Sequence, residues 1–294
     1  MAAGVAPTID AIPRGTSEQM STITETSFEM QGERSKLRPL LRGVWASRGL
    51  IRTLARKDFY VKYRRASIGI LWVVGLPLIQ AAVLAIIFSR VTRFATPVKF
   101  PVFVLSGILP WGFFSNGIAS ATTAIVDGSN LATKVYFPRA VLPLTNVFSG
   151  FHGYIPSLGV MVALALVLKV HLGLPLLLLP ASMTLLLMMT CAFSLVLASL
   201  HVYFRDTRYA VQAAILPWFW ASGVIFPLER LGGLKKWFEL NPAVGLIQLN
   251  RAAVGAAGPG WGRPVVISLI WVVALTVIAI PLYQRYDRVY VDLL

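Results

Sequence analysis

Long runs without a single charged residue alternate with short basic segments along most of the chain. Crossing about 30 Å of hydrocarbon takes about 20 helical residues, and six of the runs are long enough. They are residues 66–89, 100–126, 140–168, 170–204, 209–228 and 264–284. A helix satisfies its own backbone hydrogen bonds in lipid, and the weak alternation of a membrane β-barrel is absent. The pattern therefore predicts an all-α membrane protein with six transmembrane helices.

The segment before the first run has two parts. Residues 1–37 are rich in Ser, Thr, Glu and Gly, and no apolar run follows their start, which predicts a disordered cytoplasmic tail. Residues 38–65 form a basic region, and residues 66–294 form the transmembrane domain. Within the basic region, apolar residues gather near one helical face and arginines near another, so we expect an amphipathic helix in the membrane interface. The apolar set is Leu50, Ile51, Leu54, Ala55 and Val61, and the arginines are Arg48, Arg52, Arg56 and Arg64.

The segment between the fifth and sixth runs is neither a span nor an ordinary loop. Residues 229–262 contain an apolar piece, residues 240–250, that is too short to cross a membrane. Gly232, Gly233, Pro242 and Gly258 divide the segment into pieces. The pattern favours an outer re-entrant or interfacial hairpin, which requires that protein or water covers its backbone.

Charge and composition agree with a membrane protein. Only 13% of the residues are charged, whereas soluble domains usually have about 25%, which excludes an ordinary soluble enzyme. With both termini in the cytoplasm, the 27 Lys and Arg residues divide 18 to 9 in favour of the inside. This is the orientation that the positive-inside rule selects. The net charge of +15 then reflects cytoplasmic anchoring, and not nucleic-acid binding.

The motifs of catalysis and energy supply are missing. The sequence has no G-x-x-x-x-G-K-[ST] phosphate loop, so the chain should not hydrolyse ATP by itself. Its single cysteine, Cys191, and three histidines have no metal-ligand spacing. No charged residue lies inside a run, which argues against a proton-driven pump. Two polar residues, Gln80 and Asn116, lie within runs and either hold helices together, the commoner use, or line a polar path.

Four stretches, in order along the chain, resemble one family. The first, DFYVKYRRASIGILWVVGLP, contains an acidic residue, Tyr-Arg-Arg, a Gly-x-x-Trp and a later Pro, with Ile68 where Leu is usual. The others are SNLATKVYFPRAVLPL at residues 129–144, YFRDTR at 203–208, and Asn241-Pro242 with Arg251. Together they are similar to the ABC-2 type permeases that export polysaccharides, teichoic acids and O-antigens, from about Leu50 to the C-terminus. The N-terminal tail has no counterpart in that family.

The resemblance implies a transport subunit and not an enzyme. Two copies would pair with two separate ATPase subunits, which would bind the ATP and Mg²⁺; this chain would need no cofactor. The cargo would be a polyprenyl-diphosphate-linked glycan, such as a cell-wall galactan, an O-antigen-like or a teichoic-acid-like polymer, carried across a bacterial inner membrane. The alternatives are an ABC-2 permease for a drug or lipid, a membrane-bound enzyme acting on polyprenyl-linked sugars, and a structural scaffold.

Three groups of residues are candidates for these roles. The loop that would dock on the ATPase contributes Asn130, Lys134, Tyr136, Phe137 and Arg139, with Arg205 and Asp206 from the other cytoplasmic turn. Lys62, Arg64 and Arg65 would bind the lipid diphosphate, because guanidinium groups suit phosphate oxygens, although simple attraction to anionic lipids explains them equally well. Sugars stack on aromatic rings, so the glycan-path candidates are Trp72, Trp111, Phe114, Trp218 and Trp220.

Overall fold

The computed structural model describes residues 37–64, 66–91, 96–129 and 137–286. The chain divides into two units, Met1–Pro39 and Leu40–Leu294, and the second contains the whole transmembrane region. The predicted tail, residues 1–37, lies outside the described residues except for its last position.

Every regular element among the described residues is a helix, which confirms the all-α class. In chain order they are α2 (Leu37–Ala46), α3 (Arg48–Arg64), η1 (Gly69–Leu71), α4 (Trp72–Val91), α5 (Phe100–Thr122), α6 (Ala124–Asp127), α8 (Val141–Val167), η2 (Leu174–Leu178), α9 (Leu179–Tyr203), α10 (Thr207–Ala221), η3 (Leu228–Leu234), α11 (Lys235–Phe238), α12 (Pro242–Ala253) and α13 (Gly262–Tyr286).

Five helical stretches are long and apolar enough to cross a membrane, and they match the first four predicted spans and the sixth. They are Gly69–Phe88, Phe100–Thr122, Val141–Val167, Leu174–Tyr203 and Gly262–Tyr283. The fifth predicted span contains α10, which has 15 residues and is therefore about 22 Å long, less than the hydrocarbon thickness. It ends at a turn in which Gly223 has a φ of +62°, a left-handed conformation that suits glycine. Six continuous spanning helices are therefore not confirmed.

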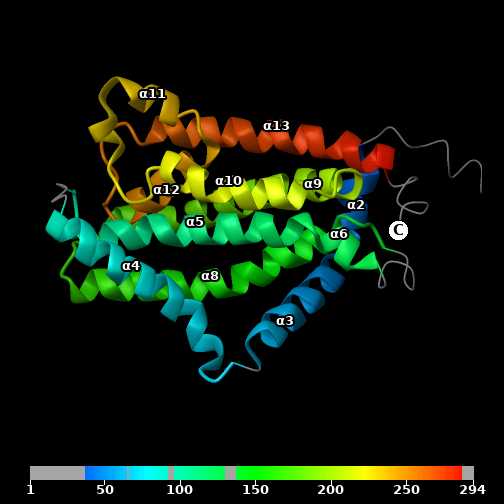
Figure 1. Cartoon of the computed structure of the whole chain (residues 1–294), viewed down its shortest axis with the longest axis horizontal. Helices are drawn as coiled ribbons and strands as arrows, with labels where there is room; N and C mark the ends of the chain where they lie inside the picture. Colours follow the sequence, from blue (N-terminus) through cyan, green and yellow to red (C-terminus); the bar gives the residue numbers. More distant parts are fainter. Residues whose placement is uncertain (1–36, 65, 92–95, 130–136, 287–294) are drawn as a thin grey trace, which may run out of the picture. The chain divides into compact units, whose positions relative to one another are not determined.

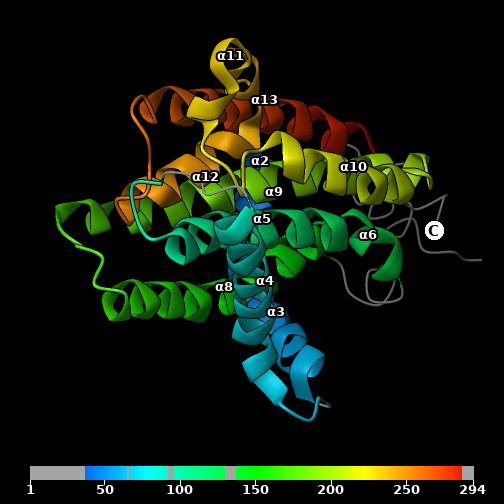
Figure 2. The same cartoon turned by 60° about the vertical axis from the view of Figure 1, so that its left-hand side comes forward.

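Helix α5 is the central helix of the transmembrane unit (Figure 1). It packs against α4, α8, α9, α10 and α12, and most of its side chains are buried. Both views show α8 beside α5 on one side and α9 and α13 on the other (Figure 2). In contrast, α4 and α13 present many large apolar side chains to the surface, as helices in contact with lipid do.

The predicted amphipathic helix is present as α3, but its buried face differs from the expected one. Ile51, Ala55 and Phe59 are buried, one helical turn apart, whereas Leu50 and Val61 are exposed. Helix α3 packs against α8, where the Phe59 ring lies 5.9 Å from the ring of His152. The buried side chains are spaced four residues apart, so they lie along one face of α3. The helix is thus packed on the transmembrane helices along one side.

Residues 229–262, the predicted outer segment, contain α12, in which all 12 residues are buried. The side chain of Asn241 caps the helix by accepting a hydrogen bond of 3.0 Å from the Ala243 backbone N–H. Helix α12 packs against α5, α9 and α13. Protein therefore covers this backbone, which is the condition for a re-entrant segment. Its depth relative to a bilayer stays a prediction.

Candidate functional site

The end of the predicted ATPase-docking loop is anchored inside the protein. Phe137 is buried in an apolar cluster with Ile51 of α3 and Val141 of α8. A Cβ atom at Gly43 would lie only 3.1 Å from Cγ of Pro138, so α2 also lies close to this point. Phe137 is therefore buried beside α3 and α8, with α2 close to its neighbour Pro138, and is not free on the surface. The sequence did not reveal this anchor, because nothing in Gly43 or Ile51 indicates their partners.

The other predicted docking residues are placed as follows. Asn130, Lys134 and Tyr136 lie outside the described residues, and Arg139 is half-buried. Arg205 and Asp206 are exposed in the turn between α9 and α10. Both sets lie at one end of the helices, because Ala198 in the last turns of α9 packs with Ala140, the neighbour of Arg139.

The predicted diphosphate-binding residues lie at the end of α3. Lys62 and Arg64 are exposed, and Arg65 lies outside the described residues. Partial burial raises the pKa of Asp58, and the nearby Lys57 opposes this shift. The exposed side of α3 also contains a second basic group, with Tyr60 beside the guanidinium of Arg56 at 5.8 Å. This group, lining one shallow depression, comprises Arg52, Thr53, Arg56, Lys57 and Tyr60. The surface as a whole suits anionic phosphate groups.

Three of the five predicted glycan-path aromatics meet in the interior. Phe114 has no exposed surface, and its ring lies 5.2 Å from that of Trp218 in an edge-to-face arrangement. Trp111 lies 6.0 Å from Phe114 and 6.1 Å from Trp218. The Trp218 indole N–H donates a hydrogen bond of 2.8 Å to Asn241. These contacts join α5, α10 and the start of α12, and favour a packing role.

The two remaining aromatics are closer to the surface. Trp72, at the start of α4, is half-buried, and Trp220 of α10 is 49% exposed. They stay candidates for the glycan path.

A buried cation stabilises the turn that ends α10. Arg251 of α12 is only 1% exposed. Its guanidinium donates hydrogen bonds of 3.0 Å to the Gly223 carbonyl and 2.6 Å to the Val224 carbonyl, and lies 3.8 Å from the centre of the Phe103 ring. Burial lowers the pKa of Arg251 to about 9, so the group stays charged at neutral pH. The sequence placed Arg251 in a motif but gave no sign of these partners.

The neighbouring Asn250 makes a second set of polar contacts between helices. Its amide nitrogen donates a hydrogen bond of 2.8 Å to the Ser106 carbonyl of α5. Its amide oxygen accepts one of 3.3 Å from the Ser182 hydroxyl of α9. The Asn-Arg pair thus fixes α12 to α5, α9 and the turn after α10.

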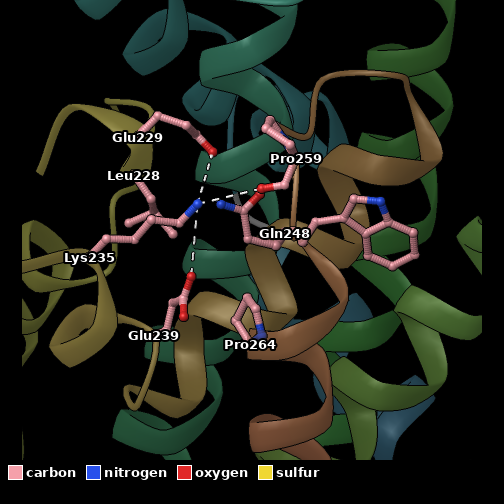
Figure 3. A pocket seen from close by; sticks show the side chains of 10 residues that line it. Leu228, Glu229, Lys235, Glu239, Gln248, Pro259 and Pro264 are labelled. Carbon is pink, nitrogen blue, oxygen red and sulfur yellow. Dashed lines mark hydrogen bonds and ion pairs between the residues drawn. The ribbon is translucent and has the colours of Figure 1, made fainter. Parts of the chain in front are cut away.

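An ion-pair group links several parts of the predicted outer segment to one another (Figure 3). The Lys235 ammonium lies 3.7 Å from a Glu229 oxygen and 3.9 Å from a Glu239 oxygen, and donates to the Pro259 carbonyl at 3.4 Å. Arg263 at the start of α13 lies 3.4 Å from the other Glu239 oxygen. Glu239 is almost fully buried, whereas Glu229 is partly exposed. This group connects η3 and α11 to the segment that leads into α13.

Replacing Glu239 with glutamine should lower the thermal stability of the purified protein. The variant loses the charge that pairs with both Lys235 and Arg263, and the loss of a largely buried partner leaves their charges less compensated. We expect a loss of about 1–3 kcal/mol, because a buried polar group without its partner has that cost. Thermal unfolding in detergent measures it. Glu229→Gln is the matched control with a smaller effect, and equal midpoints for the two variants would contradict this prediction.

Comparison with known proteins identifies the class. Residues 49–253 match the family model described as ABC-2 type transporter, so the chain belongs to the ABC-2 type transporter family. Membership confirms the resemblance found in the sequence, and implies an ATP-binding partner. Five apolar helices and this family together indicate a multi-pass inner-membrane protein.

Individual relatives are named as export or transport proteins. The chain is 31% identical to the O-antigen export system permease protein RfbA of Myxococcus xanthus, over 72% of this chain and 83% of the relative. It is 26% identical to a protein of the same name from Klebsiella pneumoniae, over 67% of this chain and 77% of the relative. It is 22% identical to the polysialic acid transport protein KpsM of Escherichia coli, over 69% of this chain and 80% of the relative.

Proposed function

We propose that this chain is the permease subunit of an ABC exporter that moves a polysaccharide across the inner membrane. The observation that carries this proposal is the 31% identity to an O-antigen export permease over 83% of that relative's length. A second relative is named for polysialic acid transport. Both names describe long glycans, which supports a polymer as cargo over a drug or a simple lipid. We propose further that the glycan is carried on a polyprenyl diphosphate, for which the exposed basic side of α3 is the binding surface.

The energy comes from a separate ATP-binding subunit, which holds the ATP and Mg²⁺. The chain has no phosphate loop of its own. We propose that this subunit docks on residues 130–139 and on the turn with Arg205 and Asp206. The docking end then faces the cytoplasm, with both termini on that side, as the distribution of Lys and Arg predicts.

Two copies of the chain form the permease in this proposal. Helix α10 has one buried residue, Val211, and exposes Leu216 and Trp220. A helix that packs so little within its own chain is suited to a contact with a second copy or with lipid.

Purification of the protein from its native membrane in mild detergent tests the energy supply. We expect a stoichiometric soluble subunit with a G-x-x-x-x-G-K-[ST] motif among the chains that co-purify. The control is a parallel purification of an unrelated membrane protein. An ATPase that copurifies equally with both proteins is not a specific partner. If no such subunit appears after chemical cross-linking, the exporter loses its energy source and the proposal fails.

Replacing Phe137 with alanine should weaken the coupling between the ATPase and the membrane helices. The change removes the ring that packs on Ile51 and Val141, so the docking loop loses its anchor on α3 and α8. We expect the permease-stimulated ATP turnover to fall several-fold in the purified complex. Trp237→Ala is the matched control, because Trp237 is an aromatic residue of α11 that is 72% exposed and lies outside the proposed docking residues. Equal turnover in the two variants would show that Phe137 does not transmit the motion.

A further inference from the structure

Helix α5 has an unusual distribution of exposed residues. Every residue from Val102 to Trp111 is buried, because other helices surround this half of α5. In the other half, Gly112 is half-buried and Asn116 and Ser120 are exposed. These three positions are four residues apart, so they lie on one helical face. We call Gly112, Asn116 and Ser120 the α5 polar stripe.

The side chains of the stripe bond to their own helix. The Asn116 amide donates a hydrogen bond of 2.8 Å to the Gly112 carbonyl, and the Ser120 hydroxyl donates one of 2.8 Å to the Asn116 carbonyl. The sequence left open whether Asn116 holds helices together or lines a polar path. Its amide nitrogen is bound within α5 and its side chain is exposed, so the second use fits the structure better.

Helix α8 extends the polar surface beside the stripe. The half-buried Asn146 donates a hydrogen bond of 3.4 Å to the Ser120 carbonyl. One turn further along α8, Ser149 is half-buried and Gly150 is exposed. Small and polar residues thus occur together on two neighbouring helices that both cross the membrane.

Lipid is a poor neighbour for this surface. The Asn116 amide nitrogen and the Ser120 hydroxyl each donate one hydrogen bond within α5, but the amide and the hydroxyl can form further hydrogen bonds that hydrocarbon cannot supply. A polar group without a partner in hydrocarbon has a cost of about 2–7 kcal/mol, depending on the reference state. The surfaces of this protein that suit lipid are different, since α4 exposes Ile79, Val83 and Ile86, and α13 exposes Val273 and Val277. Polar residues inside transmembrane segments usually face a water-filled cavity or the interior of the bundle. The stripe therefore suits water and a hydroxyl-rich ligand.

We propose that the α5 polar stripe, with Asn146 of α8, is a wall of the aqueous path through which the glycan moves. The Asn116 amide oxygen and the Ser120 hydroxyl oxygen accept hydrogen bonds from sugar hydroxyl groups and water, and Gly112 leaves room for the polymer. Because each such contact is weak and has an equivalent in water, the polymer is not held at any one position. This inference rests on the proposed function for the identity of the polymer, but the presence of water at the stripe does not.

The position of the stripe along α5 also indicates which part of the path it forms. It lies in the half of α5 that leads to α6, the end where the ATPase-docking residues are placed. The opposite half of α5 is covered, in part by α12. In the proposed orientation the stripe is thus on the cytoplasmic half, where the polymer enters.

Thiol accessibility in native membranes tests the path directly. In a Cys191→Ser background, Asn116→Cys and Ser120→Cys are introduced singly, together with two controls. Val277→Cys is on an exposed apolar face of α13, and Ile118→Cys is buried in α5. A small, charged, membrane-impermeant methanethiosulfonate reagent is applied to inverted vesicles that contain the whole transporter, with and without ATP. We expect at least about tenfold faster modification at positions 116 and 120 than at either control, because only a hydrated thiol ionises.

Two results would overturn the proposal. Modification of Asn116→Cys no faster than Val277→Cys, both with and without ATP, would place the stripe against lipid. Rapid formation of a disulfide between two copies of the Asn116→Cys chain, without modification by the reagent, would place it against a second copy. Export of the native polymer is measured separately with Asn116→Leu, which should slow it several-fold. If the thiols at positions 116 and 120 are hydrated but the unmutated protein exports no polymer, the aqueous path is supported and the proposed function is overturned.

Discussion

Replacement of the buried Arg251 with methionine should strongly destabilise the protein. The variant keeps much of the side-chain volume but leaves the carbonyls of Gly223 and Val224 without their donor. Each unsatisfied buried carbonyl has a cost of about 1–3 kcal/mol. The variant also loses the cation–π contact of the guanidinium, which lies 3.8 Å from the centre of the Phe103 ring. Such a contact is worth about 2 kcal/mol when desolvated. Together these losses predict poor assembly in the membrane.

The measurement is the thermal unfolding midpoint in detergent, with the yield of folded protein beside it. Arg230→Met is the matched control, because Arg230 is also on the outer segment but is exposed. We expect the control to unfold near the wild-type midpoint. Arg251→Lys should be intermediate, since an ammonium group keeps the charge but loses the planar fork that reaches both carbonyls. A normal midpoint for Arg251→Met would contradict the role assigned to this residue.

The second large effect is expected from Gly245→Ala, where α12 crosses α13. A Cβ atom at Gly245 would meet the Ser268 hydroxyl and the Pro264 carbonyl of α13. The Ser268 hydroxyl already donates a hydrogen bond of 2.7 Å to the Pro242 carbonyl, so it is not free to move aside. Overpacking typically has a cost of about 1–3 kcal/mol, and a backbone carbonyl gives way less easily than a side chain. We expect the variant to lose the close approach of the two helices.

The unfolding midpoint and a cross-link between α12 and α13 measure this effect. Gly159→Ala is the matched control, because Gly159 also lies inside a helix but has nothing within 4 Å of an added Cβ. This control should be neutral or slightly stabilising, since alanine favours a helix over glycine by up to about 1 kcal/mol. If both variants unfold at the same temperature, the tight helix crossing is not important for stability.

The long spans could be predicted from the sequence because hydrocarbon thickness sets a minimum length for an uncharged run. The length of α10 could not, since the run from 209 to 228 continues through Gly223, and only the backbone shows that the helix has already ended there. An apolar run in the sequence indicates which residues avoid water, but it does not indicate where a helix ends within an apolar environment.

Partners from distant parts of the chain were also beyond the sequence. Trp111, Phe114 and Trp218 suit both a sugar path and a packed core, and their ring contacts favour the core. The sequence likewise left two uses for Asn116, holding helices together or lining a polar path, and the exposure of its side chain favours the second. A residue type states which interactions are possible, whereas the packing of the neighbouring helices decides which one is made.

Depletion of the chain from living cells tests the central claim, export of a lipid-linked polysaccharide, most directly. The measurement is the amount of polyprenyl-diphosphate-linked polymer on each face of the inner membrane, detected in sealed vesicles of known orientation. The account predicts that the polymer accumulates on the cytoplasmic face and disappears from the outer face, and that the unmutated chain restores it. Continued appearance of the polymer at the outer face, without accumulation inside, would contradict the account.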